Sequence, residues 1–195
     1  RMFIYLALSK KLTTVEYDAA LLGLFFKNYL SVMGMYSPKH DDKREDLSIL
    51  GTDYIFTAPT RYALSNVFNK TQNTNLFLYQ FDHSLSFDGW GPRYPFCVNH
   101  SCHGADMPFT FHNFSPFNPN SEEDALSNTM IDFWTNFAYS GNPNKGPHTV
   151  TTNWQSFTPQ NLMYMHLTTP NVANEYGLRK KQCDLWDRLG YNFGT

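Results

Sequence analysis

The sequence predicts a packed domain that mixes helices and strands, and three observations support this fold class. The 195 residues are 42% hydrophobic and 17% aromatic, which is enough apolar material to bury a sizeable core. Two short runs, at 75–82 and 162–167, have the apolar character of buried strands. Segments at 14–30 and 121–140 carry the cap signals of helices, and a terminal helix is expected at 178–189. No internal repeat or second domain is indicated.

The N-terminal region is predicted to pass from a strand-like segment into a helix. The apolar run Met2–Leu8 indicates a strand end or another buried segment. Thr13 or Thr14, with Glu16 nearby, is a suitable N-cap for a helix that continues to about Leu30. The apolar residues of this helix recur with a period close to that of an α-helix: Val15, Ala19, Leu22, Phe26 and Leu30.

The following region is predicted to contain a charged loop and an interrupted helix. The loop covers Pro38–Asp46, and the helix covers Leu47–Leu64. We expect an interruption before Pro59, because proline disfavours helical geometry in the residue that precedes it. Three side chains of this region are expected to face inward: Phe56, Tyr62 and Val67.

The second half of the chain is predicted to hold two strands and two helices. The strand at 75–82 leads into a long loop rich in glycine and proline. A helix then starts at Ser121, where acidic residues in the first turn complement the helix dipole, and it ends at Gly141-Asn142-Pro143. We expect its aromatic residues to form core rather than a sugar-stacking platform. A short strand at Leu162–Leu167 and a terminal helix at Leu178–Leu189 follow.

Charge and hydropathy exclude two classes of partner. Fifteen basic and seventeen acidic residues give a net charge of -2, and the longest basic run is Arg179-Lys180-Lys181, so we expect no nucleic-acid partner. The apolar stretches 2–8 and 19–26 are far shorter than the ~20 residues that span a bilayer. Arg1 opens onto an apolar run without an initiator methionine or signal peptide, so we expect a processed or clipped piece of a longer protein.

Cysteines and glycosylation sequons together predict a secreted protein. Cys97 and Cys102 are placed to close a small disulfide loop, whereas Cys183 is unmatched and suggests a partner outside this chain. Asn69 and Asn99 stand in Asn-x-Ser/Thr sequons and are candidate glycosylation sites. A third sequon at 113–115 is followed by proline, which makes it a poor acceptor.

The segment 97–111 contains the candidate catalytic residue. His103 stands on a glycine turn between the possible disulfide loop and a Pro-Phe run. Cys97, His100, Cys102 and His103 superficially offer four zinc ligands, but residues this close in sequence rarely wrap one ion, so we favour a disulfide beside a catalytic histidine and expect no metal or cofactor. The remaining candidates are expected to be surface or hydrogen-bonded residues: His40, His83, His112, His148 and His166.

Five motifs in order carry a family resemblance. They are LYQFDH at 78–83, HGADMPF at 103–109, FWTNFAYSGNPN at 133–144, NW at 153–154 and CDLW at 183–186. With these motifs the chain resembles the C-terminal part of a type-B carboxylesterase, in the branch of the α/β-hydrolases that includes the cholinesterases. The resemblance implies an α/β fold in which residues 1–195 supply the C-terminal portion of one α/β-hydrolase domain, with a mostly parallel central sheet flanked by helices.

The resemblance implies that His103 is the general base of a Ser-His-Glu triad. Triad order in this fold is serine, then acid, then histidine, so a chain that begins late in the family sequence retains only the histidine. This order accounts for the lack of a Gly-x-Ser-x-Gly motif, and it places the family's Glu just ahead of Arg1. Asp106 then supports the loop rather than acting as the triad acid. We expect this chain alone to be inactive.

Three further positions are implied to contact a small ester substrate. Met2 corresponds to a residue that faces the substrate gorge, where cholinesterases use aromatic rings to hold a quaternary ammonium. Phe3 corresponds to the acyl side of the pocket. Ala105 stands beside the histidine where a cholinesterase carries a tyrosine, so Met2 and Ala105 both argue against choline specificity.

The resemblance also implies partners. The main one is the N-terminal remainder of the same protein, which would supply the serine and the Glu. The helices at 14–30 and 178–189 correspond to elements that pair in a homodimer, although ordinary core helices are an equal alternative. The usual partner of Cys183 has no cysteine at its corresponding position in 56–59. Two other functions stay open: an inactive family member with an adhesion or storage role, and an aromatic-rich carbohydrate module.

Overall fold

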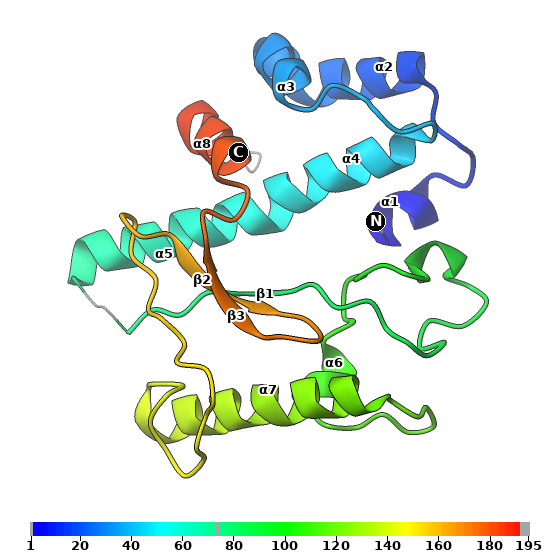
Figure 1. The fold of residues 1–195 in the computed structure, drawn as a ribbon. Coiled ribbons are helices and arrows are strands. Elements are labelled where there is room, and N and C mark those ends of the chain that lie inside the picture. Colours follow the sequence, from blue (N-terminus) through cyan, green and yellow to red (C-terminus); the bar gives the residue numbers. More distant parts are fainter. Residues whose placement is uncertain (1, 73–74, 192–195) are drawn as a thin grey trace. The chain divides into compact units, whose positions relative to one another are not determined.

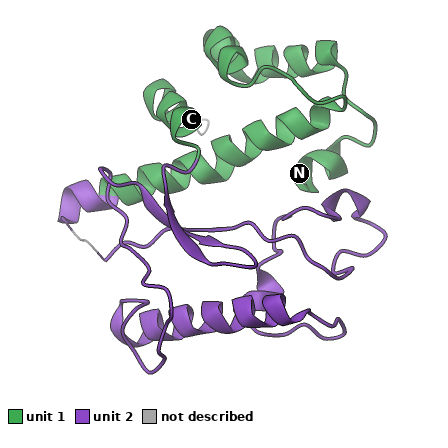
Figure 2. Cartoon of the chain, viewed as in Figure 1, with its two compact units in different colours: residues 1–66, 179–195 green, residues 67–178 purple. Residues whose placement is uncertain are grey.

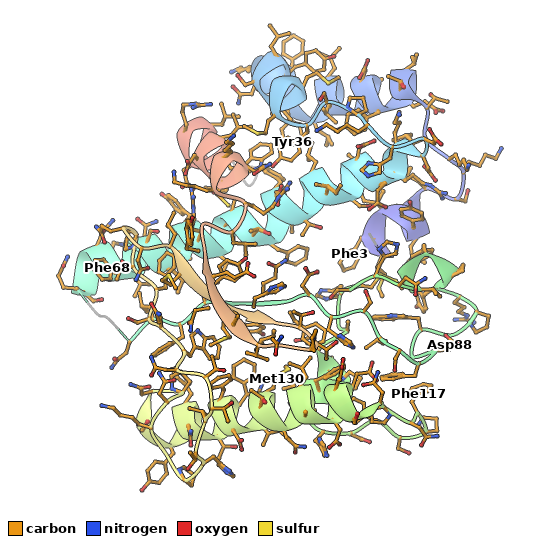
Figure 3. All side chains as sticks on the ribbon, viewed as in Figure 1. Phe3, Tyr36, Phe68, Asp88, Phe117 and Met130 are labelled. Atoms are coloured by element: carbon orange, nitrogen blue, oxygen red, sulfur yellow. A yellow bond between two sulfur atoms is a disulfide. The ribbon has the colours of Figure 1, made fainter. Side chains whose placement is uncertain are left out.

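The computed structural model describes residues 2–72 and 75–191, and the chain divides into two compact units (Figures 1 and 2). Unit 1 contains residues 1–66 and 179–195, and unit 2 contains residues 67–178. Each unit has a hydrophobic cluster of its own. Figure 3 shows Tyr36 among the packed side chains of unit 1, and Met130 on α7 in unit 2.

Unit 1 is built from helices. They are α1 (Met2–Ala7), α2 (Thr14–Phe25), a 3₁₀ turn (Phe26–Asn28), α3 (Tyr29–Met35), α4 (Lys43–Thr52), a π-helical turn (Asp53–Thr57), α5 (Ala58–Thr71), whose last turn belongs to unit 2, and α8 (Lys180–Leu189). The predicted start of the second helix is confirmed, because Thr13 and Glu16 form a capping box. The Thr13 hydroxyl accepts from the Glu16 amide at 3.3 Å, and the Glu16 carboxylate accepts from the Thr13 amide at 2.8 Å.

Two predictions for this region are wrong. The segment 2–8, expected to be a strand end or another buried segment, is helical over Met2–Ala7, and that helix has no buried residue. The Leu8 amide donates to the Ile4 carbonyl at 2.9 Å, so the backbone is satisfied without a partner strand. The helix expected to continue to about Leu30 ends at Phe25, and its apolar residues of helical period are largely exposed, with Val15 at 77% and Leu30 at 82%. The helix buries Tyr17 and Leu21 instead, and it breaks at Phe26, so the two halves follow different axes and share no single stripe.

The helix after the charged loop begins earlier than predicted, at Lys43, and it runs through the π-helical turn into α5. The interruption expected near Pro59 is present in that turn, where the Ala58 amide donates to the Asp53 carbonyl five residues back. The inward orientation expected for three residues is wrong. More than 40% of each side chain is exposed in the structure: Phe56, Tyr62 and Val67.

The core of unit 1 gathers around Trp186 of α8. Its indole nitrogen donates to the Tyr36 hydroxyl at 2.9 Å, and that hydroxyl donates to the Asp53 carboxylate at 3.1 Å. Asp53 is also paired with Arg179, the residue that precedes α8. These bonds satisfy polar groups inside an aromatic cluster, and they fix the predicted C-terminal helix against α3 and the π-helical turn.

Unit 2 contains a three-stranded sheet in the order β1-β2-β3. Strand β1 (Tyr79–Phe81) pairs in parallel with β2 (Met163–Leu167), and β2 pairs antiparallel with β3 (Ala173–Tyr176). The two predicted strands are therefore present, while β3 was not predicted. The described sheet has one parallel and one antiparallel pair, in place of the mostly parallel sheet that the family resemblance implies.

Helix α7 (Ser121–Ser140) runs alongside the sheet of unit 2 (Figure 1). Its buried side chains pack against those of the sheet. Its start and end agree with the sequence. Asn120 and Glu123 form a capping box at the start, and Gly141 takes the left-handed conformation, with φ of 73°, at the end. The buried side chains of the helix and the sheet meet in one cluster: Leu126, Met130, Phe133, Met165 and Leu167.

Candidate functional site

His103 lies at the second position of a tight turn in unit 2. The Ala105 amide donates to the Cys102 carbonyl at 3.0 Å, which closes a four-residue β-turn around His103 and Gly104. Gly104 has φ of 86°, a left-handed conformation that glycine adopts without strain. Cys102 and Ala105 are buried while the His103 side chain is exposed. The turn therefore presents the imidazole outward from a backbone that is held on both sides.

The disulfide predicted on the N-terminal side of His103 is present. Cys97 and Cys102 are bonded, and both are buried. Cys97 ends the short 3₁₀ helix Pro95–Cys97, and its amide donates to the Tyr94 carbonyl at 2.9 Å. The bond fixes the chain immediately before the histidine.

On the C-terminal side, Phe109 anchors the short helix α6 (Met107–Thr110) to the sheet and to α7. Its side chain is completely buried, and its ring centroid lies 5.1 Å from that of Phe81 and 5.4 Å from that of His83. Its carbonyl accepts a hydrogen bond of 2.8 Å from the Ser127 hydroxyl on α7. The C-terminal flank of the His103 turn is thus attached to the packed part of unit 2, while the disulfide constrains the other flank.

A buried polar network around Glu123 lies beside this anchor. The Glu123 side chain is 0% exposed and accepts bonds from His83 Nε2 at 2.9 Å, the Ser86 amide at 2.7 Å and the Ser86 hydroxyl at 2.6 Å. The Asn120 amide donates to it at 2.9 Å. Burial acts to raise the pKa of Glu123, but the hydrogen bonds from His83 and Ser86 outweigh it, so the pKa lies below its ordinary value. The carboxylate is therefore held ionised inside the unit.

His83 agrees with the prediction of a hydrogen-bonded rather than a catalytic histidine. It is 7% exposed, and its Nδ1 lies 3.1 Å from the Thr169 hydroxyl. The link to Glu123 was not foreseen, because the two residues are 40 positions apart. The sequence signal that pointed to Glu123 was the spacing of Asn120 and Glu123, which is typical of a capping box at a helix start.

The predicted substrate-contacting residues divide between the units. Met2 and Phe3 lie on α1 in unit 1, where Met2 is half-buried and Phe3 is exposed. Ala105 lies in unit 2 and is 2% exposed, beneath the turn that presents His103. Asp106 precedes α6, and its negative charge, together with the larger effect of burial, raises the pKa of Tyr79 on β1.

The candidate modification sites lie on exposed positions. Asn69 is exposed on the last turns of α5, and Asn99 is exposed within the disulfide loop, with φ of 61°.

Cys183 is fully buried on α8, and this burial raises the pKa of its thiol to about 11. A neutral thiol of this kind is chemically inert while the unit stays folded.

Two structural findings concern partners of other kinds. Within residues 2–72 and 75–191, no three His, Cys, Asp or Glu side chains are grouped so that they would hold a metal ion. No helix in the same described ranges has the length and apolar character that crossing a bilayer demands.

Comparison with known proteins identifies the family. Residues 6–186 match the carboxylesterase family. The chain is 29% identical over 133 residues to bile salt-activated lipase of Homo sapiens, covering 67% of the chain and 17% of the lipase. It is 28% identical over 153 residues to the same enzyme of Mus musculus, covering 76% of the chain and 25% of the enzyme. It is 32% identical over 120 residues to acetylcholinesterase of Electrophorus electricus, covering 59% of the chain and 18% of the cholinesterase.

The chain belongs to the carboxylesterase family, which confirms the resemblance carried by the five motifs. The family match implies the α/β-hydrolase fold, and the helix-rich structure with its small mixed sheet is consistent with one part of that fold. The matched segments span 17% to 25% of these three relatives.

Proposed function

We propose that the intact protein containing this chain hydrolyses carboxylic esters with a Ser-His-Glu triad in which His103 is the general base. The observation that carries the proposal is the exposed imidazole on the Cys102–Ala105 turn, held between the disulfide and the Phe109 anchor. A general base needs this combination, because it must reach a reacting hydroxyl while its backbone stays fixed. The relatives include a lipase and a cholinesterase, and both names denote ester hydrolases.

The proposed reaction has two acyl-transfer steps. The His103 imidazole takes the proton of the serine hydroxyl as the serine oxygen attacks the ester carbonyl, and it returns that proton to the departing alcohol. The resulting acyl-enzyme is attacked by water, whose proton passes to His103 and then to the serine as the acid leaves. In this proposal the serine, the Glu and the oxyanion donors belong to the N-terminal remainder, so this chain alone is inactive.

The same proposal assigns the substrate side of the site to Met2, Phe3 and Ala105. Met2 and Ala105 both lack the aromatic ring that holds a quaternary ammonium by cation-π attraction, so a neutral ester is proposed in preference to a choline ester. Ala105 offers only a methyl group beside His103, where a cholinesterase carries a tyrosine.

We further propose that the protein is secreted and glycosylated at Asn69 and Asn99. The Cys97–Cys102 disulfide supports an oxidising compartment, and both asparagines are exposed. Helices at 14–30 and 178–189 are proposed to form a homodimer, supported by exposed apolar side chains such as Phe26 and Leu30. Sedimentation of the purified protein, before and after glycosidase treatment, tests the proposed glycosylation and the proposed homodimer.

A fluorophosphonate probe and one substitution test the esterase proposal. We expect the probe to label a serine of the intact protein, and His103→Ala to lower kcat/KM for a neutral ester by at least about a thousandfold. His100→Ala is the matched control, since His100 is an exposed histidine within the disulfide loop of the same segment. A loss smaller than about tenfold in the His103 variant would remove it from the triad. Absence of labelling would instead favour an inactive family member with an adhesion or storage role.

A further inference from the structure

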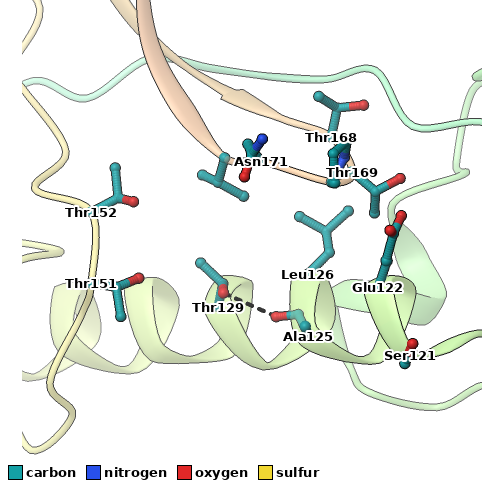
Figure 4. Close-up of a pocket in the computed structure, with 12 residues that line it drawn as sticks. Ser121, Glu122, Ala125, Leu126, Thr129, Thr151, Thr152, Thr168, Thr169 and Asn171 are labelled. Atoms are coloured by element: carbon teal, nitrogen blue, oxygen red, sulfur yellow. Dashed lines mark hydrogen bonds between the residues drawn. The ribbon is translucent and has the colours of Figure 1, made fainter.

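A pocket in unit 2 lies outside the residues assigned to ester hydrolysis. It is formed by the N-terminal half of α7, the segment 151–152 and the turn 168–172 that joins β2 to β3 (Figure 4). Its volume of about 370 Å³ falls in the lower part of the range of roughly 300–1,000 Å³ that is usual for small-molecule sites. Figure 4 shows Leu126 and Thr129 rising from α7 toward the turn.

Hydroxyl groups dominate the lining of this pocket. Five of the twelve described lining residues are threonines, joined by Ser121 and Asn171. Glu122 is the one charged residue among the twelve, and none of the twelve is basic or aromatic. Apolar surface comes from residues such as Leu126 and Val172. The lining therefore combines carbon surface with many neutral oxygen atoms.

Three of the threonine hydroxyls have their proton engaged elsewhere. Thr129 donates to the Ala125 carbonyl at 2.9 Å, and Thr168 donates to the Asp82 carbonyl at 3.2 Å. Each such oxygen keeps free lone pairs, because a hydroxyl has one proton and two acceptor sites. Toward the pocket these threonines act as hydrogen-bond acceptors.

The Thr169 hydroxyl also has its proton engaged, in this case by His83. The Glu123 carboxylate only accepts hydrogen bonds, so the His83 Nε2 that lies 2.9 Å from it carries a proton. In the tautomer that carries its proton on Nε2, the other nitrogen, Nδ1, is an acceptor, and the Thr169 hydroxyl at 3.1 Å donates to it. The buried pair thus orients the Thr169 oxygen as a third acceptor.

An acceptor-rich pocket selects a ligand that donates hydrogen bonds. Anions are disfavoured, because the lining has no basic residue and includes Glu122, and because the Asn120 side chain already caps the Glu122 and Glu123 amides at the start of α7. Flat aromatic ligands lack a ring to stack on. A cation would meet the positive end of the α7 dipole, which opposes the attraction of Glu122. A neutral molecule with several hydroxyl groups satisfies the acceptors and places its C–H groups on Leu126 and Val172.

We propose that this pocket binds a neutral polyhydroxylated molecule of monosaccharide type, whose hydroxyl groups donate to Thr129, Thr168 and Thr169. The ligand is a free sugar or the terminal sugar of a glycan, since both present the same hydroxyl chemistry. The proposal is independent of the esterase activity, because its evidence lies in residues that the proposed reaction does not use.

Binding is tested on the full-length protein that contains this chain. Saturation-transfer NMR titrations would use D-glucose, D-galactose and D-mannose, together with their methyl glycosides and glycerol. We expect at least one sugar to bind with Kd of about 1 mM. Equal affinity for the sugar and its methyl glycoside indicates a glycan terminus, and binding of the free sugar alone indicates a soluble ligand. Saturation transfer to none of these probes overturns the proposal.

Isosteric substitution locates the site. Thr129→Val removes the acceptor while keeping the side-chain shape, and we expect sugar affinity to fall roughly fivefold. Thr52→Val is the matched control, because the Thr52 hydroxyl donates to the carbonyl four residues back in α4, as Thr129 does in α7, but lies outside the pocket. Unchanged affinity in the Thr129 variant, or stronger binding of ethylammonium than of any sugar, refutes the assignment.

Discussion

Glu123→Gln tests the buried network that holds the capped start of α7 to the loop after β1. The substitution keeps the size of the side chain but converts one acceptor oxygen into an NH₂ donor. In the structure, one carboxylate oxygen accepts from His83 and the Ser86 amide, and the other accepts from the Ser86 hydroxyl and the Asn120 amide. Whichever way the new amide is oriented, its nitrogen faces a backbone N–H of Ser86 or Asn120.

The cost of this mismatch follows from the burial of the site. One backbone N–H loses its acceptor where the side chain is 0% exposed, at about 1–3 kcal/mol, and the surviving bonds lose the help of the charge, at about 1 kcal/mol more. We therefore expect Glu123→Gln to lower the free energy of unfolding by about 2–4 kcal/mol. That is a large fraction of the ~5–15 kcal/mol available to a typical domain.

Urea unfolding of the full-length protein measures this loss, and hydrogen exchange at the Ser86 and Asn120 amides locates it. The pKa of Glu123 is lowered in the folded state, so its contribution is present above about pH 4.5 and is lost as the pH falls through the folded value. The difference between the two proteins should shrink below that pH. Glu122→Gln is the control, since Glu122 is exposed and should change stability by less than ~0.5 kcal/mol. A loss below about 1 kcal/mol, or one that persists unchanged in acid, would refute the reasoning.

Two further predictions concern backbone space and a buried thiol. A Cβ at Gly146 would lie 2.7 Å from the Asn136 Cα, so Gly146→Ala should destabilise the protein by about 2 kcal/mol. A Cβ at Gly23 within α2 meets open space, so Gly23→Ala should stabilise the protein by about 0.5–1 kcal/mol. Thermal unfolding measures both changes, and a Gly146 variant that is as stable as the Gly23 variant would contradict this prediction. Burial raises the pKa of Cys183 to about 11, so its contribution to stability is complete below pH 9 and is lost as the pH rises through 11. The stability difference between wild type and Cys183→Ala should narrow across that interval, and a constant difference would count against a neutral native thiol.

Elements with strong local signals were predictable. Helix α7 carries its own N-cap, acidic first turn and terminal glycine, and these act within a few residues of each other. Its Ser121 start and Gly141 stop were therefore readable from the sequence. Strand β2 was predictable from its continuous apolar run at 162–167. Strand β3 lacks a continuous apolar run, and it is a strand because its backbone pairs with β2.

Elements whose state depends on a partner were misread. The apolar segment 2–8 has no strand beside it in the described part of unit 1, so Met2–Ala7 folds as a helix that satisfies its own hydrogen bonds. The stripe containing Val15 and Leu30 has helical period, yet the break at Phe26 and the contacts of Tyr17 and Leu21 decide which face is covered. Periodicity shows that a face exists, but it does not show what packs on it.

The candidate site shows the same division between local and distant information. The sequence by itself was enough to select His103 as the candidate residue and to predict the disulfide that constrains its loop. It was enough because the histidine, its glycine turn and the two cysteines lie within a few residues of one another. The family motifs are likewise contiguous strings that sequence alone reveals. Only the tertiary structure joined His83 to Glu123 and brought Thr129 and Thr169 to one pocket, because side chains 40 residues apart meet only after the strands and α7 have packed together.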